Sequence, residues 1–219
     1  MPIKILPNQS RAFHTPAQAW AWALNIIEQF GDKIRTEDGQ LCKEVMNLQV
    51  TVLEPCIGWP IQGSGWDMAG LNRYAEQLLS PENPGFDYTY GERLNAYGYA
   101  IQVMDGDTPG EFVWCGYNQV DYIIRKLREN PTTRRAIAIT WSIPDDPIKR
   151  HVPCLQSVDF LYRAGKLHEV AYFRSQDVLQ AWPANVYGLS RLLDYVAGKT
   201  GMVAGSVTTF SASAHIYEK

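Results

Sequence analysis

Two nucleotide-binding signatures are missing from this sequence, and so is any membrane segment. It has no G-x-G-x-x-G stretch and no G-x-x-x-x-G-K-[ST] stretch, which excludes the dinucleotide and P-loop fingerprints. No apolar run reaches transmembrane length, and residues 1–9 are too short and mixed for a secretory signal. We therefore expect a cytoplasmic protein that has no membrane partner.

The sequence also lacks an excess of positive over negative charge. The chain has 20 Lys and Arg against 23 Asp and Glu, a net charge of −3. A phosphate backbone requires a basic face, so a dedicated nucleic-acid binder is not expected, whereas a small anionic ligand needs only a few local arginines.

Cysteines are few and isolated, and none forms a C-x-x-C pair. This pattern predicts neither a metal site nor a disulfide scaffold, and it leaves one thiol available as a nucleophile. The four cysteines are Cys42, Cys56, Cys115 and Cys154.

What is present fits one globular domain that spans residues 1–219. Apolar residues make up 46% of the chain and charged residues 20%. Periodicity and capping residues predict helices over residues 17–30, 67–79, 118–129 and 183–198. Strands are predicted over residues 45–53, 135–143, 154–162, 169–174 and 203–217, with a loop over 55–66. Helices in the first half and strands gathered in the second indicate an α+β fold.

Cys154 is the cysteine with the best setting for chemistry. It enters an apolar strand, where a buried core cysteine would be the ordinary interpretation. A nucleophilic thiol needs nearby positive charge, and Arg134, Arg135 and Arg174 can supply it. Arg174 and Ser175 together also suit a phosphate monoester, because the guanidinium matches two phosphate oxygens and the hydroxyl donates to a third.

Three polar residues farther along the chain admit two interpretations each. Asn185 lies near the start of a predicted helix, where it can cap the helix or present an amide to the edge of a pyrimidine. His215 and Tyr217 alternate at the end of the last predicted strand and so share a face. They are either a polar strand end or a pair that binds a sugar hydroxyl.

The order and spacing of these signals resemble the thymidylate synthase family. The segment N-P-T-T-R-R-A-I-A-I-T-W resembles the family stretch in which two arginines precede a strand that ends in Trp. It is followed by segments similar to the family's Pro-Cys, Arg-Ser-x-Asp, Pro-x-Asn and His-x-Tyr motifs. The gaps match the family pattern, with 19 residues from Arg135 to Cys154, 20 to Arg174, 11 to Asn185 and 30 to His215.

This resemblance covers residues 130–217, and upstream Tyr90 matches the tyrosine of the family's Tyr-Gly turn. It implies the thymidylate synthase fold, an α+β fold with a mixed twisted sheet packed by helices. It also implies a homodimer that packs one sheet against its twin. In that dimer Arg134 and Arg135 would complete the partner's phosphate site, whereas Arg174 and Ser175 would bind the phosphate of their own site.

The reaction implied by the resemblance is reductive methylation of dUMP to dTMP. Cys154 would add to C6 of the pyrimidine, with its thiol pKa lowered by the arginines and by Arg174 above all. C5 would then take a one-carbon unit from 5,10-methylene-tetrahydrofolate or a methanopterin analogue. Asn185 favours uracil, because the family's cytosine hydroxymethylases carry Asp at this position.

The resemblance also implies roles for the other site residues. Asn185 would hold the O4 and N3 edge of the base, and Asp177 would orient the base or the pterin. Tyr90 would place the water that removes the C5 proton. His215 and Tyr217 would bind the ribose. No metal ligand is implied. The family's catalytic glutamate has two candidates, Glu76 and Glu92, and Arg35 is a candidate for its N-terminal phosphate-binding arginine.

Several positions depart from the family pattern. Leu155, Phe173, Ala181 and the pair Ser213-Ala214 stand where bacterial members carry His, Gln, Gly and Gly-Asp. The chain also ends two residues after Tyr217, whereas bacterial members continue into a tail that closes over the cofactor. Without such a lid water could replace hydride, so a dUMP, dCMP or CMP hydroxymethylase on the same scaffold stays open as an alternative. The nucleophilic cysteine argues against a third class, a non-catalytic nucleotide-binding or RNA-binding relative.

Overall fold

A computed structural model describes residues 9–218 of the chain. Residues 1–8, which make up most of the stretch where no secretory signal is expected, lie outside the described part, as does residue 219. The helices are α1 (Pro16–Phe30), α2 (Met68–Leu79), α3 (Tyr90–Asn95), α4 (Gln119–Glu129), the 3-10 turn η1 (Asp146–Ile148) and α5 (Trp182–Thr200). The strands are β1 (Ser10–Phe13), β2 (Asp32–Arg35), β3 (Leu41–Val52), β4 (Tyr97–Asp105), β5 (Thr108–Tyr117), β6 (Ile137–Ile139), β7 (Leu155–Arg163), β8 (Lys166–Phe173), β9 (Gln176–Asp177) and β10 (Ala204–Tyr217).

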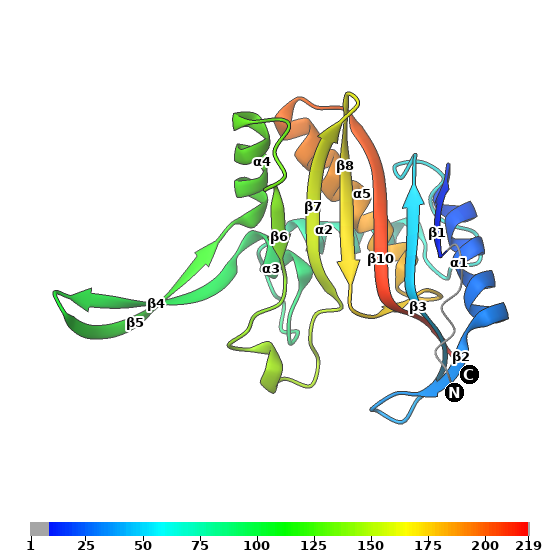
Figure 1. Cartoon of the computed structure of the whole chain (residues 1–219), viewed down its shortest axis with the longest axis horizontal. Coiled ribbons are helices and arrows are strands. Elements are labelled where there is room, and N and C mark those ends of the chain that lie inside the picture. Colours follow the sequence, from blue (N-terminus) through cyan, green and yellow to red (C-terminus); the bar gives the residue numbers. More distant parts are fainter. Residues whose placement is uncertain (1–8, 219) are drawn as a thin grey trace.

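One mixed, twisted sheet organises the molecule (Figure 1). Its main strand order is β1-β3-β10-β8-β7-β6, with β2 paired to β3 and β9 paired to β10. Strand β10 runs parallel to β8 and antiparallel to β3, so the last strand of the chain lies in the middle of the sheet. The predicted α+β class and mixed sheet are confirmed. None of the helices within residues 9–218 is long and apolar enough to cross a membrane.

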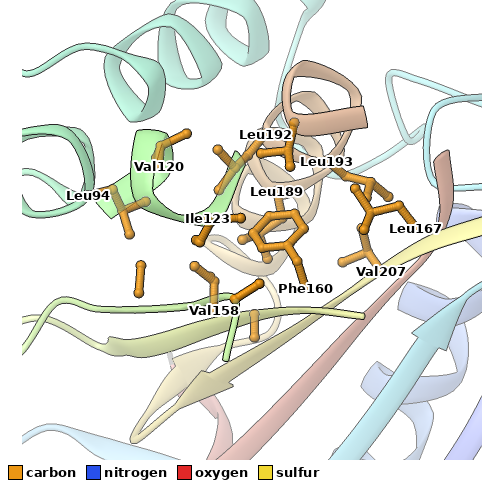
Figure 2. Close-up of a cluster of buried hydrophobic side chains, with 14 of the residues drawn as sticks. Leu94, Val120, Ile123, Val158, Phe160, Leu167, Leu189, Leu192, Leu193 and Val207 are labelled. Carbon is orange, nitrogen blue, oxygen red and sulfur yellow. The ribbon is translucent and has the colours of Figure 1, made fainter. Parts of the chain in front are cut away.

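Helix α5 lies across one face of the sheet and forms the centre of the core. Leu189, Leu192 and Leu193 of α5 are almost fully buried and belong to the same cluster as Phe160 of β7 (Figure 2). Burial of each such side chain stabilises the fold by about 1.5–3 kcal/mol relative to exposure. The helix is thereby fixed over the sheet, and its first turn is held against β10, because Trp182 Nε1 donates to Thr209 Oγ1.

Three predicted helices are found within one residue of their expected starts, and the predicted Asn118 cap is confirmed. Thr15 caps α1 through the backbone N–H of Gln18, and the Gln18 side chain accepts in return from Thr15. Asp67 and Asn118 cap α2 and α4 in the same way, each through the backbone N–H three residues on.

The predicted strand over residues 135–143 is too long at both ends, since β6 spans only Ile137–Ile139 and its hydrogen bonds to β7 extend no farther than Ala136 and Thr140 among the described residues. Beyond Ile139 the chain turns into a loop, because the backbone N–H of Ser142 bonds to the buried Asp146 carboxylate instead of a neighbouring strand. The hairpin of β4 and β5 was not predicted, and it extends away from the sheet (Figure 1). Together with β1, β2 and β3 it corrects the expectation that the first half is mainly helical.

Candidate active site

A pocket of about 560 Å³ opens where α2, α3 and α5 meet the end of β10 and the loop that precedes β7. This volume is typical of a small-molecule site. Its walls combine predicted site residues with others that were not foreseen. The lining residues are Trp66, Tyr74, Gln77, Phe86, Asp87, Tyr88, Thr89, Tyr90, His151, Cys154, Ser175, Gln176, Asp177, Ala181, Ala184, Asn185, His215 and Tyr217.

Cys154 lines this pocket just before β7, half-buried and with Arg174 beside it. The Arg174 guanidinium donates from Nε to the carbonyl of Pro153 at 2.9 Å and from Nη2 to the carbonyl of Val152 at 3.0 Å. The same Nη2 lies 3.8 Å from the Cys154 sulfur. These bonds fix both the loop that carries the thiol and the positive charge that faces it.

The net effect on the thiol differs from the expectation. Burial raises the pKa of Cys154 above its ordinary value, and the positive charge of Arg174 opposes this shift without cancelling it. The arginine therefore acts in the predicted direction, but the prediction of a lowered thiol pKa is wrong. Arg134 and Arg135 do not line this pocket and add no nearby charge.

Tyr90 reaches the backbone next to Cys154 from the first turn of α3. Its hydroxyl accepts a hydrogen bond from the backbone N–H of Leu155 at 3.2 Å, which holds the ring beside the start of β7. Gly91 makes this placement possible, because a Cβ there would lie 1.9 Å from the carbonyl oxygen of Gln77 at the end of α2. The Tyr-Gly pair is thus needed for α3 to pack closely against α2.

Asn185 lies in the first turn of α5 but does not cap it. The capping position is Ala181, which makes no side-chain cap, and the Asn185 side chain is only 6% exposed. Its Oδ1 accepts a hydrogen bond from the hydroxyl of Tyr74 at 2.5 Å. The helix-cap interpretation of Asn185 is therefore excluded, and the amide faces the pocket.

The remaining predicted residues come from the paired strands β9 and β10. Asp177 lies opposite His215 in the strand register, and its carboxylate accepts from the backbone N–H groups of Leu179 and Gln180. His215 packs edge-on against Tyr217 with ring centroids 4.8 Å apart. Burial lowers the pKa of His215, so the ring is neutral over a wider pH range and can both donate and accept.

Arg134 and Arg135 are the predicted residues that the structure does not bring to Cys154. They line a separate polar hollow of about 450 Å³ at the end of α4, together with Lys126, Glu129, Asn130, Thr132 and Thr133. Both are exposed. Within one chain, the predicted phosphate ligands that lie next to the thiol are therefore Arg174 and Ser175.

Several pocket residues were missed by sequence reasoning. Tyr74 was assigned to an apolar helix face, and periodicity cannot show that its hydroxyl crosses to α5. Tyr88 neighbours the Tyr-Gly turn in sequence, and burial raises its pKa to about 12. Two further aromatic side chains, Trp66 and Phe86, line the pocket wall. Trp66 donates a hydrogen bond to the carbonyl of Gln180, and Phe86 is exposed.

The candidates for the family's catalytic glutamate and for its N-terminal phosphate-binding arginine do not lie at the pocket. Glu76 is exposed, Glu92 accepts a hydrogen bond from Asn83, and Arg35 donates to the carbonyl of Gly39. None of the three lines the pocket. Residues 9–218 contain no group of three or more His, Cys, Asp or Glu side chains that could hold a metal ion.

Comparisons with known proteins agree with this geometry. A family model described as thymidylate synthase matches residues 63–219, which include every residue that lines the pocket. A Methanosarcina barkeri protein named "Putative thymidylate synthase" is 43% identical over 206 residues, covering 93% of this chain and 87% of the relative. Proteins with the same name from Methanothermobacter thermautotrophicus and Methanocaldococcus jannaschii are 37% and 35% identical, covering 92% and 85% of this chain and 90% and 81% of the relatives.

Proposed function

Because this chain belongs to the thymidylate synthase family of methyltransferases, we propose that it converts dUMP to dTMP by reductive methylation. The observation that carries this proposal is the pairing of Cys154 with Arg174 at 3.8 Å, with Cys154 lining the same pocket as Asn185. A thiol with a fixed positive charge and an amide for the ring edge are what addition to a pyrimidine C6 requires. A binding protein would need only the amide and the phosphate groups.

Cys154 acts as the nucleophile in this mechanism. Its sulfur forms a bond to C6, the C5–C6 double bond opens, and negative charge spreads over C5 and O4. Arg174 favours the thiolate that attacks, against the effect of burial. The amide nitrogen of Asn185 donates to O4 and stabilises the charge that develops there.

Remote contacts position the nucleotide for this attack. Arg174 and Ser175 bind the phosphate, and His215 and Tyr217 bind the sugar hydroxyl from the end of β10. Binding energy far from the ring then holds C6 over the sulfur, which lowers the barrier to the chemical step. Tyr90, whose hydroxyl lies next to Cys154 on the backbone N–H of Leu155, orders the water that removes the C5 proton.

A reduced pterin that carries a methylene group supplies both the carbon and the hydride. The pocket fits such a flat ring, because Trp66 and Phe86 provide aromatic surface and Phe86 is 62% exposed at the rim. Asp177, already fixed by two backbone N–H groups, can accept a hydrogen bond from the pterin or from the base. Both 5,10-methylene-tetrahydrofolate and a methanopterin analogue offer this chemistry.

We further propose that the active enzyme is a homodimer. The helices that pack on the sheet lie on one of its faces (Figure 1). The alternating burial of β6 and β8 places the exposed Ile137, Ile139 and Tyr172 on the opposite face, where Phe210 stacks on Tyr172. A second copy packed on that face would cover them. It would also bring Arg134 and Arg135 of each copy to the phosphate of the other.

Product analysis tests the reaction. Purified enzyme is incubated with dUMP and either methylene-tetrahydrofolate or its methanopterin counterpart, and the nucleotide is identified by mass spectrometry. We expect H5 to be replaced by a methyl group while oxidised pterin forms. A hydroxymethyl product would reassign the chain as a hydroxymethylase, and the same assay with dCMP and CMP covers that alternative.

Two cysteine variants test the nucleophile. Cys154→Ser should bind dUMP but form no product, because the hydroxyl is a far weaker nucleophile than the thiolate. Cys115→Ser is the matched control, since Cys115 lies in the β4–β5 hairpin away from the pocket. Turnover by Cys154→Ser at the wild-type rate would rule out covalent catalysis.

A further inference from the structure

Helices α2 and α5 are joined by two tyrosine–asparagine hydrogen bonds of opposite direction. Tyr74 of α2 donates to Asn185 Oδ1 of α5 at 2.5 Å, and Tyr187 of α5 donates to Asn72 Oδ1 of α2 at 2.6 Å. Only the first pair lines the pocket. The second pair therefore supplies an internal comparison for what the first does beyond holding the helices together.

The hydrogen bond from Tyr74 fixes the orientation of the Asn185 amide, because it holds Oδ1 toward the Tyr74 hydroxyl. A carbonyl oxygen can only accept, so the Tyr74 hydroxyl must donate. Burial raises the pKa of Tyr74 well above its ordinary value, so the hydroxyl stays protonated at neutral pH. Within residues 9–218 the Asn185 amide nitrogen has no hydrogen-bond partner, so it is available to a ligand.

From this geometry we infer that Tyr74 is a specificity-determining residue, which selects uracil over cytosine by holding the Asn185 amide in one orientation. The inference rests on the proposed function of the pocket as a pyrimidine nucleotide site. Tyr74 is a positioning residue in this scheme, because it acts on the base through Asn185.

The chemistry of the two bases explains the selection. Uracil presents an acceptor at O4 beside a donor at N3, whereas cytosine presents a donor at N4 beside an acceptor at N3. With Tyr74 bound to one lone pair of Oδ1, the amide nitrogen of Asn185 meets O4 and the second lone pair of Oδ1 meets N3–H. Cytosine would require the amide to flip. The Tyr74 hydroxyl would then have to turn and accept from the N–H₂ group, and its own proton would lose the acceptor that Asn185 Oδ1 provides.

The ring of Tyr74 is packed so that its hydroxyl can be removed alone. A Cβ at Gly188 of α5 would lie 3.1 Å from Tyr74 Cε1, and the Tyr74 ring meets Trp66 edge-on at 6.1 Å between centroids. Phenylalanine keeps these contacts. In Tyr74→Phe the amide is then free to turn, and it can adapt to either base.

The test is nucleotide binding by calorimetry, without any pterin. For Tyr74→Phe we expect the preference for dUMP over dCMP, as the ratio of their Kd values, to fall about tenfold or more, since one mismatched buried donor is removed. Tyr187→Phe removes the sister bond between the same helices and should leave the ratio unchanged. An equal loss of preference in both variants would mean that the bond merely supports the fold.

An aspartate background sharpens the test. In Asn185→Asp both side-chain ends are oxygens, so there is no orientation for Tyr74 to choose. Tyr74→Phe should therefore change the dUMP to dCMP ratio in the wild-type background and not in the Asn185→Asp background. The same change in both backgrounds, or none in either, would overturn the inference.

Failure of the inference can be told apart from failure of the proposed function. If wild type binds dUMP selectively but forms no methylated product, the reaction is wrong and the role of Tyr74 is still measured. If product forms and Tyr74→Phe keeps full preference, only the inference is wrong. If wild type binds neither nucleotide, both are overturned.

Discussion

At the scale of single residues, Cys154 is subject to two opposing influences. Burial raises its thiol pKa, and Arg174, with Nη2 at 3.8 Å from the sulfur, lowers it. Arg174→Gln should leave burial unopposed, so less thiolate is present at a given pH. We expect alkylation of Cys154 by iodoacetamide at neutral pH to slow by about fivefold or more, and its pH profile to move to higher pH.

The alkylation measurement uses the free enzyme, so loss of phosphate binding does not affect it. Mass spectrometry of the peptides separates Cys154 from the exposed Cys56. Arg125→Gln removes an equal charge from the exposed surface of α4 and serves as the control. An unchanged profile in Arg174→Gln would mean that the arginine does not tune the thiol.

Glu169 is a second residue whose burial predicts a pH effect, this time on stability. Both carboxylate oxygens are buried without a hydrogen-bond partner, and burial raises the pKa well above its ordinary value. The folded protein therefore keeps the proton where the unfolded chain has lost it. The free energy of unfolding should fall as pH rises from the unfolded pKa, about 4.3, toward the folded one.

Glu169→Gln tests this directly, because an amide is neutral at every pH. Compared with wild type it should be more stable at pH 8, by about 1–3 kcal/mol, and lose that advantage near pH 4. Urea unfolding at several pH values measures the difference. Glu76→Gln on the exposed side of α2 is the control, and an identical pH slope in wild type and Glu169→Gln would contradict the expectation.

Site residues could be predicted where the chemistry is carried by a motif, and not where it depends on a distant contact. Cys154, Asn185 and His215 were found from their spacing and do line one pocket. Tyr74 was missed because its partner lies 111 residues away in sequence, and helical periodicity groups it with apolar neighbours. The net pKa of Cys154 was misjudged because sequence shows nearby charge but not the extent of burial.

At the scale of elements, a buried ion pair ties α3 to the loop before Cys154. Arg93 of α3 donates to Asp146 Oδ1 at 2.7 Å, with side chains 8% and 0% exposed. Asp146 also accepts from the backbone N–H of Ser142 at 2.7 Å. Asp146→Ala leaves the Arg93 charge buried without its partner, so we expect the free energy of unfolding to drop by about 3–5 kcal/mol.

The exposed pair of Arg150 and Asp38 is the matched control for that loss. Their separation is 2.9 Å, close to that of the buried pair, but the side chains are 77% and 51% exposed. Asp38→Ala should therefore cost only about 0–1 kcal/mol. Similar losses in Asp38→Ala and Asp146→Ala, measured by urea unfolding, would show that burial of the pair contributes little.

Element prediction succeeded where local signals and tertiary packing agree. Helix α4 has its Asn118 cap and a continuous buried face, and both were visible in the sequence. The β4–β5 hairpin was missed because it pairs only with itself, so its residues show no single buried face. Its Asp105-Gly106 turn, with Gly106 at φ 60°, was the available signal.

At the scale of the whole molecule, one arrangement would explain two separate features. The first is the sheet face that no helix covers, and the second is the distance of Arg134 and Arg135 from the pocket of Cys154. A homodimer through that face would hide Ile137 and Tyr172, and it would give the exposed Arg134 and Arg135 a phosphate to bind. Ile137→Glu places a charge in the proposed interface. We expect this variant to be monomeric in analytical ultracentrifugation and inactive, although Cys154 and its own pocket are intact.

Two inactive variants should restore activity to each other if the arginines act across the dimer. Cys154→Ser lacks the nucleophile, and Arg134→Gln/Arg135→Gln lacks the shared phosphate ligands. When the two are co-expressed with different tags, each mixed dimer contains one site with Cys154 and with both arginines from the partner. Random pairing then gives about one quarter of wild-type activity. If the arginines served their own subunit, every site would lack one component and the mixture would stay as inactive as its parents.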